Sequence, residues 1–107
     1  MVIRQYGVYW VKLDPTIGRE MKKTRPCLVI SPDELNLYLS TIIIAPLTTQ
    51  SRDYPTRVKT KVDGQIGWIA LDQLRTVDGA RPYEKMGNVD LKTILKVKQV
   101  LQEMLVD

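Results

Sequence analysis

Residues 40–51 read STIIIAPLTTQS and change character halfway along. The first half holds three consecutive isoleucines, and β-branched side chains favour a strand. We expect a buried strand over residues 40–45 that ends at Pro46, because proline cannot donate to a strand ladder. The polar half that follows consists of Thr48, Thr49, Gln50 and Ser51. Hydroxyl and amide groups at a strand end can donate hydrogen bonds to a phosphate, although the same residue types are common in ordinary turns.

Further strands are expected on both sides of this segment. Their residues are β-branched or aromatic, or alternate between apolar and polar, and turn residues such as Asp14 and Pro15 separate them. The expected strands cover residues 7–13, 26–31, 56–62, 65–71 and 73–77. Gly67 inside one of them indicates a bulge or a sharp bend, which small barrels need.

Two helices complete the expected fold. Residues 33–39 suit one or two short turns, and residues 91–105 suit a longer helix that Asp90 caps. The longer helix carries an apolar stripe that we expect to pack on the strands, made of Leu91, Ile94, Leu95, Leu101, Met104 and Leu105. The sequence therefore predicts a mainly β fold with a C-terminal helix, a compact and strongly bent barrel, as a single domain over residues 1–107.

Positive charge is concentrated near the N-terminus. Residues 1–31 hold six lysines and arginines against two acids, which accounts for the whole net charge of +4. Such an excess favours a polyanionic partner, either nucleic acid or an acidic protein segment. A solvated basic loop explains the charge equally well.

The lack of histidine and the presence of only one cysteine limit the catalytic chemistry that is possible. Cys27 is the single cysteine, and histidine is absent. An intramolecular disulfide and a histidine-activated nucleophile are therefore excluded, and a zinc site nearly so. The sequence shows no signal-peptide layout and no apolar run of membrane length, so we expect a cytoplasmic protein without a metal or other cofactor. Any catalysis must then use arginine, threonine and carboxylates.

The segment DPTIGREMKKTRP, residues 14–26, is long and polar for so small a domain, as functional loops often are. Arg25 stands directly before Pro26, which favours an extended conformation at the start of a strand. A guanidinium fixed there suits a phosphate. Glu20 can pair with Arg25 or accept a proton, and an ordinary surface ion pair is the simpler alternative.

A lone carboxylate interrupts the apolar stretch ALDQLRTVD, residues 70–78. Burying a charge is costly unless the charge is paired, so Asp72 needs either a partner or a chemical role. Pairing with an arginine is the structural explanation.

Taken in order, these motifs resemble the MazF/PemK toxins of bacterial toxin–antitoxin pairs. The resemblance runs nearly end to end, over GVYWVKLDPTIGREMKKTRPCLVISPDELN (residues 7–36), IIIAPLTTQS (residues 42–51) and GWIALDQLRTVD (residues 67–78). It implies a small SH3-like (CcdB/PemK-type) barrel that forms a homodimer. It also implies sequence-specific cleavage of single-stranded RNA and inhibition by an acidic antitoxin.

The resemblance further implies site residues. The catalytic arginine of T-R-P, the threonine of P-L-T and the loop glutamate fall at Arg25, Thr48 and Glu20. The D-Q aspartate, which acts as a base in some members, falls at Asp72. In some of those members an arginine stands two residues earlier, where this chain has Ala70, so the resemblance does not extend to an acid/base scheme centred on Asp72.

Single-stranded RNA requires a basic groove with stacking surfaces beside the cut. The expected RNA-binding residues are Arg19, Lys22, Lys23, Thr49, Gln50, Ser51, Arg57, Asp72 and Gln73. Lys59 can add charge, and Tyr54 or Trp68 can stack on bases, although such aromatics more often belong to a core.

In the implied chemistry the RNA 2′-hydroxyl attacks the adjacent phosphorus without a metal. The 5′-oxygen leaves, so the products carry a 2′,3′-cyclic phosphate and a 5′-hydroxyl. Arg25 and Thr48 are expected to stabilise the charge that grows on the phosphoryl oxygens, and Glu20 is the nearest candidate base.

Two other functions remain open at the level of sequence. A CcdB-like toxin that inhibits DNA gyrase by protein contact would share the barrel and the dimer but would leave RNA intact. A non-catalytic SH3-like nucleic-acid-binding module would bind RNA without cutting it.

Overall fold

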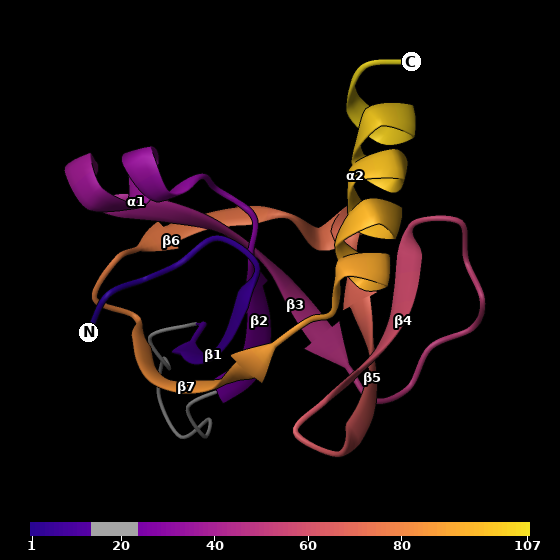
Figure 1. The fold of residues 1–107 in the computed structure, drawn as a ribbon, viewed down its shortest axis with the longest axis horizontal. Coiled ribbons are helices and arrows are strands. Elements are labelled where there is room, and N and C mark those ends of the chain that lie inside the picture. The colour runs from indigo at the N-terminus through magenta and orange to yellow at the C-terminus, as the bar shows by residue number, and fades with distance from the viewer. Residues whose placement is uncertain (14–23) are drawn as a thin grey trace, which may run out of the picture.

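The structure is a computed structural model and describes residues 1–13 and 24–107. In chain order the strands and helices are β1 (Gly7–Lys12), β2 (Thr24–Val29), α1 (Asp33–Tyr38), β3 (Thr41–Thr48), β4 (Arg57–Val62), β5 (Gln65–Ala70), the short 3-10 helix η1 (Leu71–Gln73), β6 (Arg75–Asp78), β7 (Pro82–Asn88) and α2 (Leu91–Leu105). The expected class, mainly β with a C-terminal helix, is confirmed (Figure 1).

The strand β3 is the centre of the sheet. The strands are ordered β4-β5-β3-β2-β1-β7, and β6 also pairs with β3. The first half of β3, from Thr41 to Ile44, lies against β6, and its last two residues, Leu47 and Thr48, lie against β5. By changing partners along its length, β3 lets the sheet fold over into a bent half-barrel.

This change of partners explains why Pro46 does not end the strand, contrary to our expectation. Pro46 lies between the β6-paired and β5-paired stretches of β3. On the other side it pairs in register with Cys27 of β2. Antiparallel ladders alternate hydrogen-bonded and non-hydrogen-bonded pairs, and the bond from the Ile30 amide to the Ile43 carbonyl puts Pro46 at a non-bonded position. The missing amide hydrogen therefore removes no bond to β2.

Other expectations about strands need correction. The register between β4 and β5 passes through Gly67 without a shift, so of the two features expected there, a bulge or a sharp bend, the bulge is absent. The shifts occur where β1 pairs with β7, a strand that the sequence did not predict. These irregularities disturb the two-residue alternation on which strand prediction depends. As a result, three consecutive residues of β7, Tyr83, Glu84 and Lys85, are all exposed. The strand expected over residues 73–77 begins only at Arg75, because η1 precedes it.

The β4–β5 hairpin turns on two residues with positive φ. Asp63 has φ 50° and Gly64 has φ 77°. These values match the type I′ turn, whose twist suits the flanking strands and whose second position favours glycine. The tight turn keeps the register of the hairpin in step from Val62 to Arg57.

The apolar side chains form two clusters on opposite faces of β2 and β3. The first lies under α2 and includes Leu28, Leu47, Ile69, Leu71 and Val97. The second faces the other way and includes Tyr9, Val11, Cys27, Ile42 and Ile44. Neighbouring residues of one strand thus belong to different cores, as alternation requires.

The helix α2 begins and ends where the sequence predicts, and the Asp90 side chain accepts a hydrogen bond from the Thr93 amide at 2.8 Å. The expected buried stripe is only partly correct. Ile94, Leu101 and Met104 pack against the first core, and Thr93, Val97 and Val100 are buried there. Leu91, Leu95 and Leu105 are exposed instead. The helix meets the sheet through the short side chains at one edge of the stripe, which allows it to lie close to β4.

No helix in residues 1–13 or 24–107 is long and apolar enough to cross a membrane.

Candidate functional site

Three chain segments meet at the end of β3, and hydrogen bonds join them. The segments are the residues that follow Thr48, the start of β4 and the helix η1. Arg57 donates from Nε to Asp72 Oδ1 at 2.6 Å and from Nη2 to Asp72 Oδ2 at 3.0 Å. Its remaining nitrogen Nη1 donates to Ser51 Oγ at 3.2 Å, and the Thr56 hydroxyl donates to Asp72 Oδ1 at 3.0 Å. A two-pronged ion pair of this kind fixes orientation as well as position.

This ion pair provides the arginine partner that the sequence analysis offers as the structural explanation for Asp72. The hydrogen bond from Arg57 is the main reason why the pKa of Asp72 lies below its usual value, and the same bond raises the pKa of Arg57. A carboxylate with a lowered pKa is a weaker base. Ala70 pairs with Arg57 across the β4–β5 register, so the guanidinium that reaches Asp72 comes from the neighbouring strand.

Thr48 is the last residue of β3 and is half-buried. Its hydroxyl donates to the Gln50 carbonyl at 3.0 Å and accepts from the Gln50 amide at 3.3 Å. These local bonds hold the Thr48 side chain in one orientation where the strand opens into a turn. Thr49 and Gln50 are exposed next to it.

Arg25 lies on the same face of the sheet as Thr48. Cys27 and Pro46 are partners in the β2–β3 register. Arg25 precedes Cys27 by two residues and Thr48 follows Pro46 by two, so alternation directs both side chains to one face. The pairing of β2 with β3 ends at Cys27 and Pro46, so Arg25 and Thr48 each lie two residues beyond that last pair.

The Arg25 guanidinium makes no hydrogen bond or ion pair with any residue of the described ranges. Cys27, two residues further along β2, is fully buried, and burial raises the pKa of its thiol to about 12. The strand thus passes from a half-exposed cation to a closed core within two residues. The pKa of Cys27 argues against a nucleophilic role for this thiol at neutral pH.

The same face continues across two further strands. Thr48 pairs with Trp68 of β5, and Trp68 pairs with Lys59 of β4. Lys59 Nζ lies 5.7 Å from the centre of the Trp68 ring, within the range of a cation–π contact. Thr48, Trp68 and Lys59 therefore form a row across β3, β5 and β4, and Arg25 lies on the same face of β2, two residues beyond the end of the β2–β3 pairing. Sequence reasoning missed this row, because only the register reveals it.

The remaining expected residues add no further contact to this description. Gln73 is exposed in η1. Arg19, Glu20, Lys22 and Lys23 lie outside the described residues, so their expected roles stay predictions. Among residues 1–13 and 24–107, no three or more His, Cys, Asp or Glu side chains group in a way that would hold a metal ion.

Comparison with known proteins identifies the family. Residues 4–105 match the model of the PemK-like, MazF-like toxin of type II toxin–antitoxin systems. The chain is 32% identical to the endoribonuclease EndoA of Bacillus subtilis (strain 168) over 108 residues, which cover 95% of this chain and 93% of EndoA. It is 33% identical to the endoribonuclease toxin MazF of Escherichia coli (strain K12) over 90 residues, which cover 83% and 81% of the two chains.

Solved structures agree on the fold. MazF from Deinococcus radiodurans superposes with a TM-score of 0.82 at 25% identity, over 98% of this chain and 97% of that one. MazF in a MazE–MazF crystal structure from the same organism superposes with a TM-score of 0.87 at 24% identity, over 98% and 96% of the two chains. The chain therefore belongs to the PemK-like, MazF-like toxins of type II toxin–antitoxin systems, as a MazF-like endoribonuclease toxin.

Proposed function

We propose that the chain cuts single-stranded RNA without a metal ion, by attack of a 2′-hydroxyl on the adjacent phosphorus, and that Arg25 and Thr48 hold the scissile phosphate. The products would carry a 2′,3′-cyclic phosphate and a 5′-hydroxyl. The observation that carries the proposal is that alternation from the Cys27–Pro46 pair directs both side chains to one face of two neighbouring strands.

The substrate supplies the nucleophile in this scheme, so the protein must orient the phosphate and stabilise its charge. A guanidinium suits the two equatorial oxygens because its donors form a planar fork. Arg25 has that fork free of partners among the described residues, whereas each guanidinium nitrogen of Arg57 has an acceptor. Arg25 holds its proton at any physiological pH, so its role is electrostatic rather than that of a general acid.

Thr48 would serve as the second donor. Its hydroxyl bonds only to the nearby Gln50 backbone among the described residues, and rotation about one bond would redirect it to a phosphate oxygen. Asp72 is a poor candidate for the base, since Arg57 lowers its pKa and occupies both of its oxygens. Glu20 remains the proposed base, at a position outside the described residues.

The proposal includes a homodimer and an acidic antitoxin. Its support is the family, the net charge of +4 and the MazE–MazF complex of Deinococcus radiodurans, whose MazF shares this fold. Sedimentation of the purified protein tests the dimer. A disordered acidic segment is expected to compete with RNA for a cationic surface, with an affinity that falls as salt rises.

The test is incubation of the purified protein with a long single-stranded RNA in the presence of EDTA. Discrete fragments with 5′-hydroxyl and cyclic phosphate ends are expected. Thr48→Ala should slow cleavage by about 10²–10³-fold, the usual effect of removing one donor to a developing oxyanion, and Thr48→Ser should restore much of the rate. Fragments that vanish with EDTA, or near-normal cleavage by folded Thr48→Ala, would contradict the proposal.

A further inference from the structure

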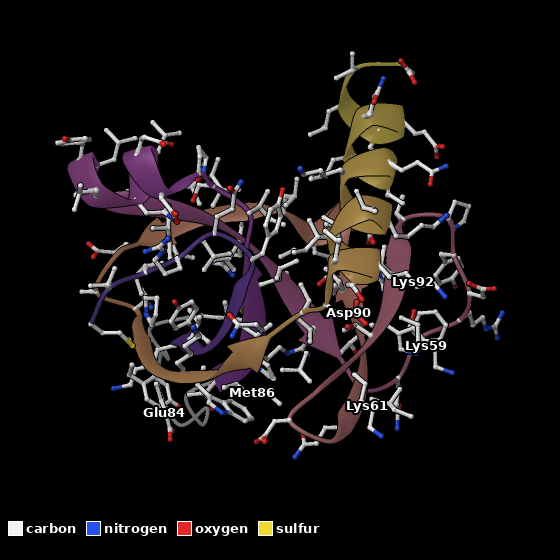
Figure 2. All side chains as sticks on the ribbon, viewed as in Figure 1. Lys59, Lys61, Glu84, Met86, Asp90 and Lys92 are labelled. Carbon is white, nitrogen blue, oxygen red and sulfur yellow. The ribbon has the colours of Figure 1, made fainter. Side chains whose placement is uncertain are left out.

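A cationic groove runs along the free edge of β4. Within the described sheet β4 pairs with β5 on one side only, and the groove follows its other side toward the first turns of α2. The groove has a volume of about 900 Å³. Its cationic and aromatic lining consists of Arg57, Lys59, Lys61, Trp68, Lys92 and Lys96. Figure 2 shows Lys59 and Lys61 on β4 and Lys92 at the foot of α2, on the same side of the molecule.

The lining of the groove combines cationic side chains with the aromatic ring of Trp68. Four lysines and two acids, Asp53 and Asp90, lie along its length, and the fifth cation, Arg57, is already paired with Asp72. Asp90 already accepts the hydrogen bond that caps α2, so part of its charge is engaged. Trp68 is half-buried on this face, with Lys59 over its ring. A row of cations beside an aromatic surface suits a single-stranded nucleic acid, because the cations can follow the phosphates of the backbone while the ring stacks on a base that projects from it.

The groove also begins where the proposed cutting site ends. Trp68 is the direct register partner of Thr48, and Lys59 is the next residue in the same row. Neighbouring strands lie about 4.8 Å apart, so the row from Thr48 to Lys59 spans about 10 Å across two strand spacings. A few nucleotides cover such a distance.

We infer that RNA flanking the cut leaves the Arg25–Thr48 face over Trp68 and continues in the β4–α2 groove, where lysines bind its phosphates. This inference rests on the proposed function and adds to it a second, sequence-independent RNA subsite. Lysines on an edge strand also protect it from pairing with other strands, which is the competing explanation for Lys59 and Lys61. That explanation gives no reason for Lys92 and Lys96 on the facing helix.

The experiment compares two charge-removing variants with a matched control. The groove variants are Lys59→Ala/Lys61→Ala and Lys92→Ala/Lys96→Ala. The control is Lys85→Ala/Lys98→Ala, which removes the same charge outside the groove lining. Each protein is tested on a short RNA limited to the cut site and on the same RNA extended on both sides.

We expect each groove variant to raise KM for the extended RNA by about tenfold at low salt. Lys92→Ala/Lys96→Ala should leave kcat and cleavage of the short RNA unchanged, whereas Lys59→Ala/Lys61→Ala should also weaken binding of the short RNA, because Lys59 lies in the row beside Thr48. The slope of log affinity against log salt should become shallower by about 0.7 for each phosphate that a variant no longer neutralises. The control should match the wild type. Trp68→Leu should weaken binding of both RNAs, because stacking on the indole beside Thr48 is removed.

Binding of the extended RNA with a 2′-deoxy nucleotide at the cut, followed by fluorescence anisotropy, separates this inference from the proposed function. If the wild type cuts neither RNA, the proposed function fails, and the binding measurements still decide the groove. If the groove variants bind and cut like the control, the groove inference is wrong while the proposed function stands. Weaker binding of an acidic peptide with unchanged RNA binding would assign the groove to a protein segment and would also overturn it.

Discussion

Two strand starts in this molecule each carry an arginine, and the two arginines differ in what surrounds them. At the start of β4, each guanidinium nitrogen of Arg57 donates to a side chain of the same chain, Asp72 or Ser51. At the start of β2, Arg25 has no such acceptor among the described residues. The first cation holds three segments of the fold together. The second has no such structural role among the described residues, and the proposed function assigns it to the RNA phosphate.

The largest expected effect concerns the core directly behind Arg25. Burial raises the pKa of Cys27 to about 12, whereas a free cysteine has a pKa of about 8.5. The reactive thiolate at pH 8 should therefore be about a thousandfold scarcer, and labelling should accelerate as pH rises. A thiol reagent should react slowly with the native protein and at the ordinary rate in urea, with Cys27→Ser as the blank. Rapid labelling of the native protein would show that β2 is open beyond Arg25.

The next effect separates the two arginines directly. Arg25→Ala should lower kcat for RNA cleavage by about 10²–10³-fold with little loss of stability, because a charge-stabilising donor is removed. Arg57→Ala should lower kcat by less than about tenfold and should reduce stability instead, because Asp72 loses its partner. Cleavage rates and urea unfolding of both proteins provide the measurements. A larger catalytic loss in Arg57→Ala than in Arg25→Ala would reverse the comparison.

Much of the fold could be predicted from local signals. The three isoleucines of β3, the Asp90 cap and the short helix after Pro32 are all where the sequence indicates. Local signals failed where the sheet itself decides the outcome. Pro46 stays within β3 because of a change of partner strands, and β7 escapes detection because its pairing with β1 is irregular. Neither fact is local in sequence.

The candidate site shows the same division. Arg25 and Thr48 stand out as residues in their motifs, yet their common face depends on the β2–β3 register. An arginine partner for Asp72 is predicted from the sequence, but which arginine is not. Arg57 begins β4 and Asp72 lies in η1, 15 residues away, and no spacing rule connects the two. The row through Trp68 to Lys59 needs two registers at once. Motifs therefore indicated the candidate residues, and strand pairing was needed to show which of them lie on one face.

A smaller effect is expected for the carboxylate that holds Arg57. Asp72→Asn should lower the free energy of unfolding at pH 7 by about 1 kcal/mol, since the pair is only partly exposed but two-pronged. Because folding lowers the pKa of Asp72, the pair stabilises the protein above the ordinary carboxyl value of about 3.9, and this contribution is lost as pH falls through the folded pKa. The difference between wild type and variant should therefore shrink in acid.

Urea unfolding of both proteins at neutral and acidic pH measures this difference. Glu84→Gln, at an exposed position of β7, removes one negative charge away from Arg57 and should leave the stability nearly unchanged. A stability gap of equal size at both pH values would mean that packing, rather than charge, accounts for Asp72.

The smallest effect tests whether Arg57 also holds the residues that follow β3. Ser51 Oγ accepts from Arg57 Nη1 at 3.2 Å and donates to the Arg52 carbonyl at 2.8 Å. Ser51→Ala should cost about 0.5 kcal/mol of stability in the wild type, near the lower end for a hydrogen bond. In the Arg57→Ala background the cost should fall, because the donor is already absent and the two changes share one interaction.

Thr49→Ala, at an exposed position near Ser51, is the control. Equal costs in both backgrounds would show that the bond contributes nothing. A loss of RNA affinity in Ser51→Ala beyond that of Arg57→Ala would instead mean that Ser51 contacts the RNA, and the region around Arg57 would then be functional as well as structural.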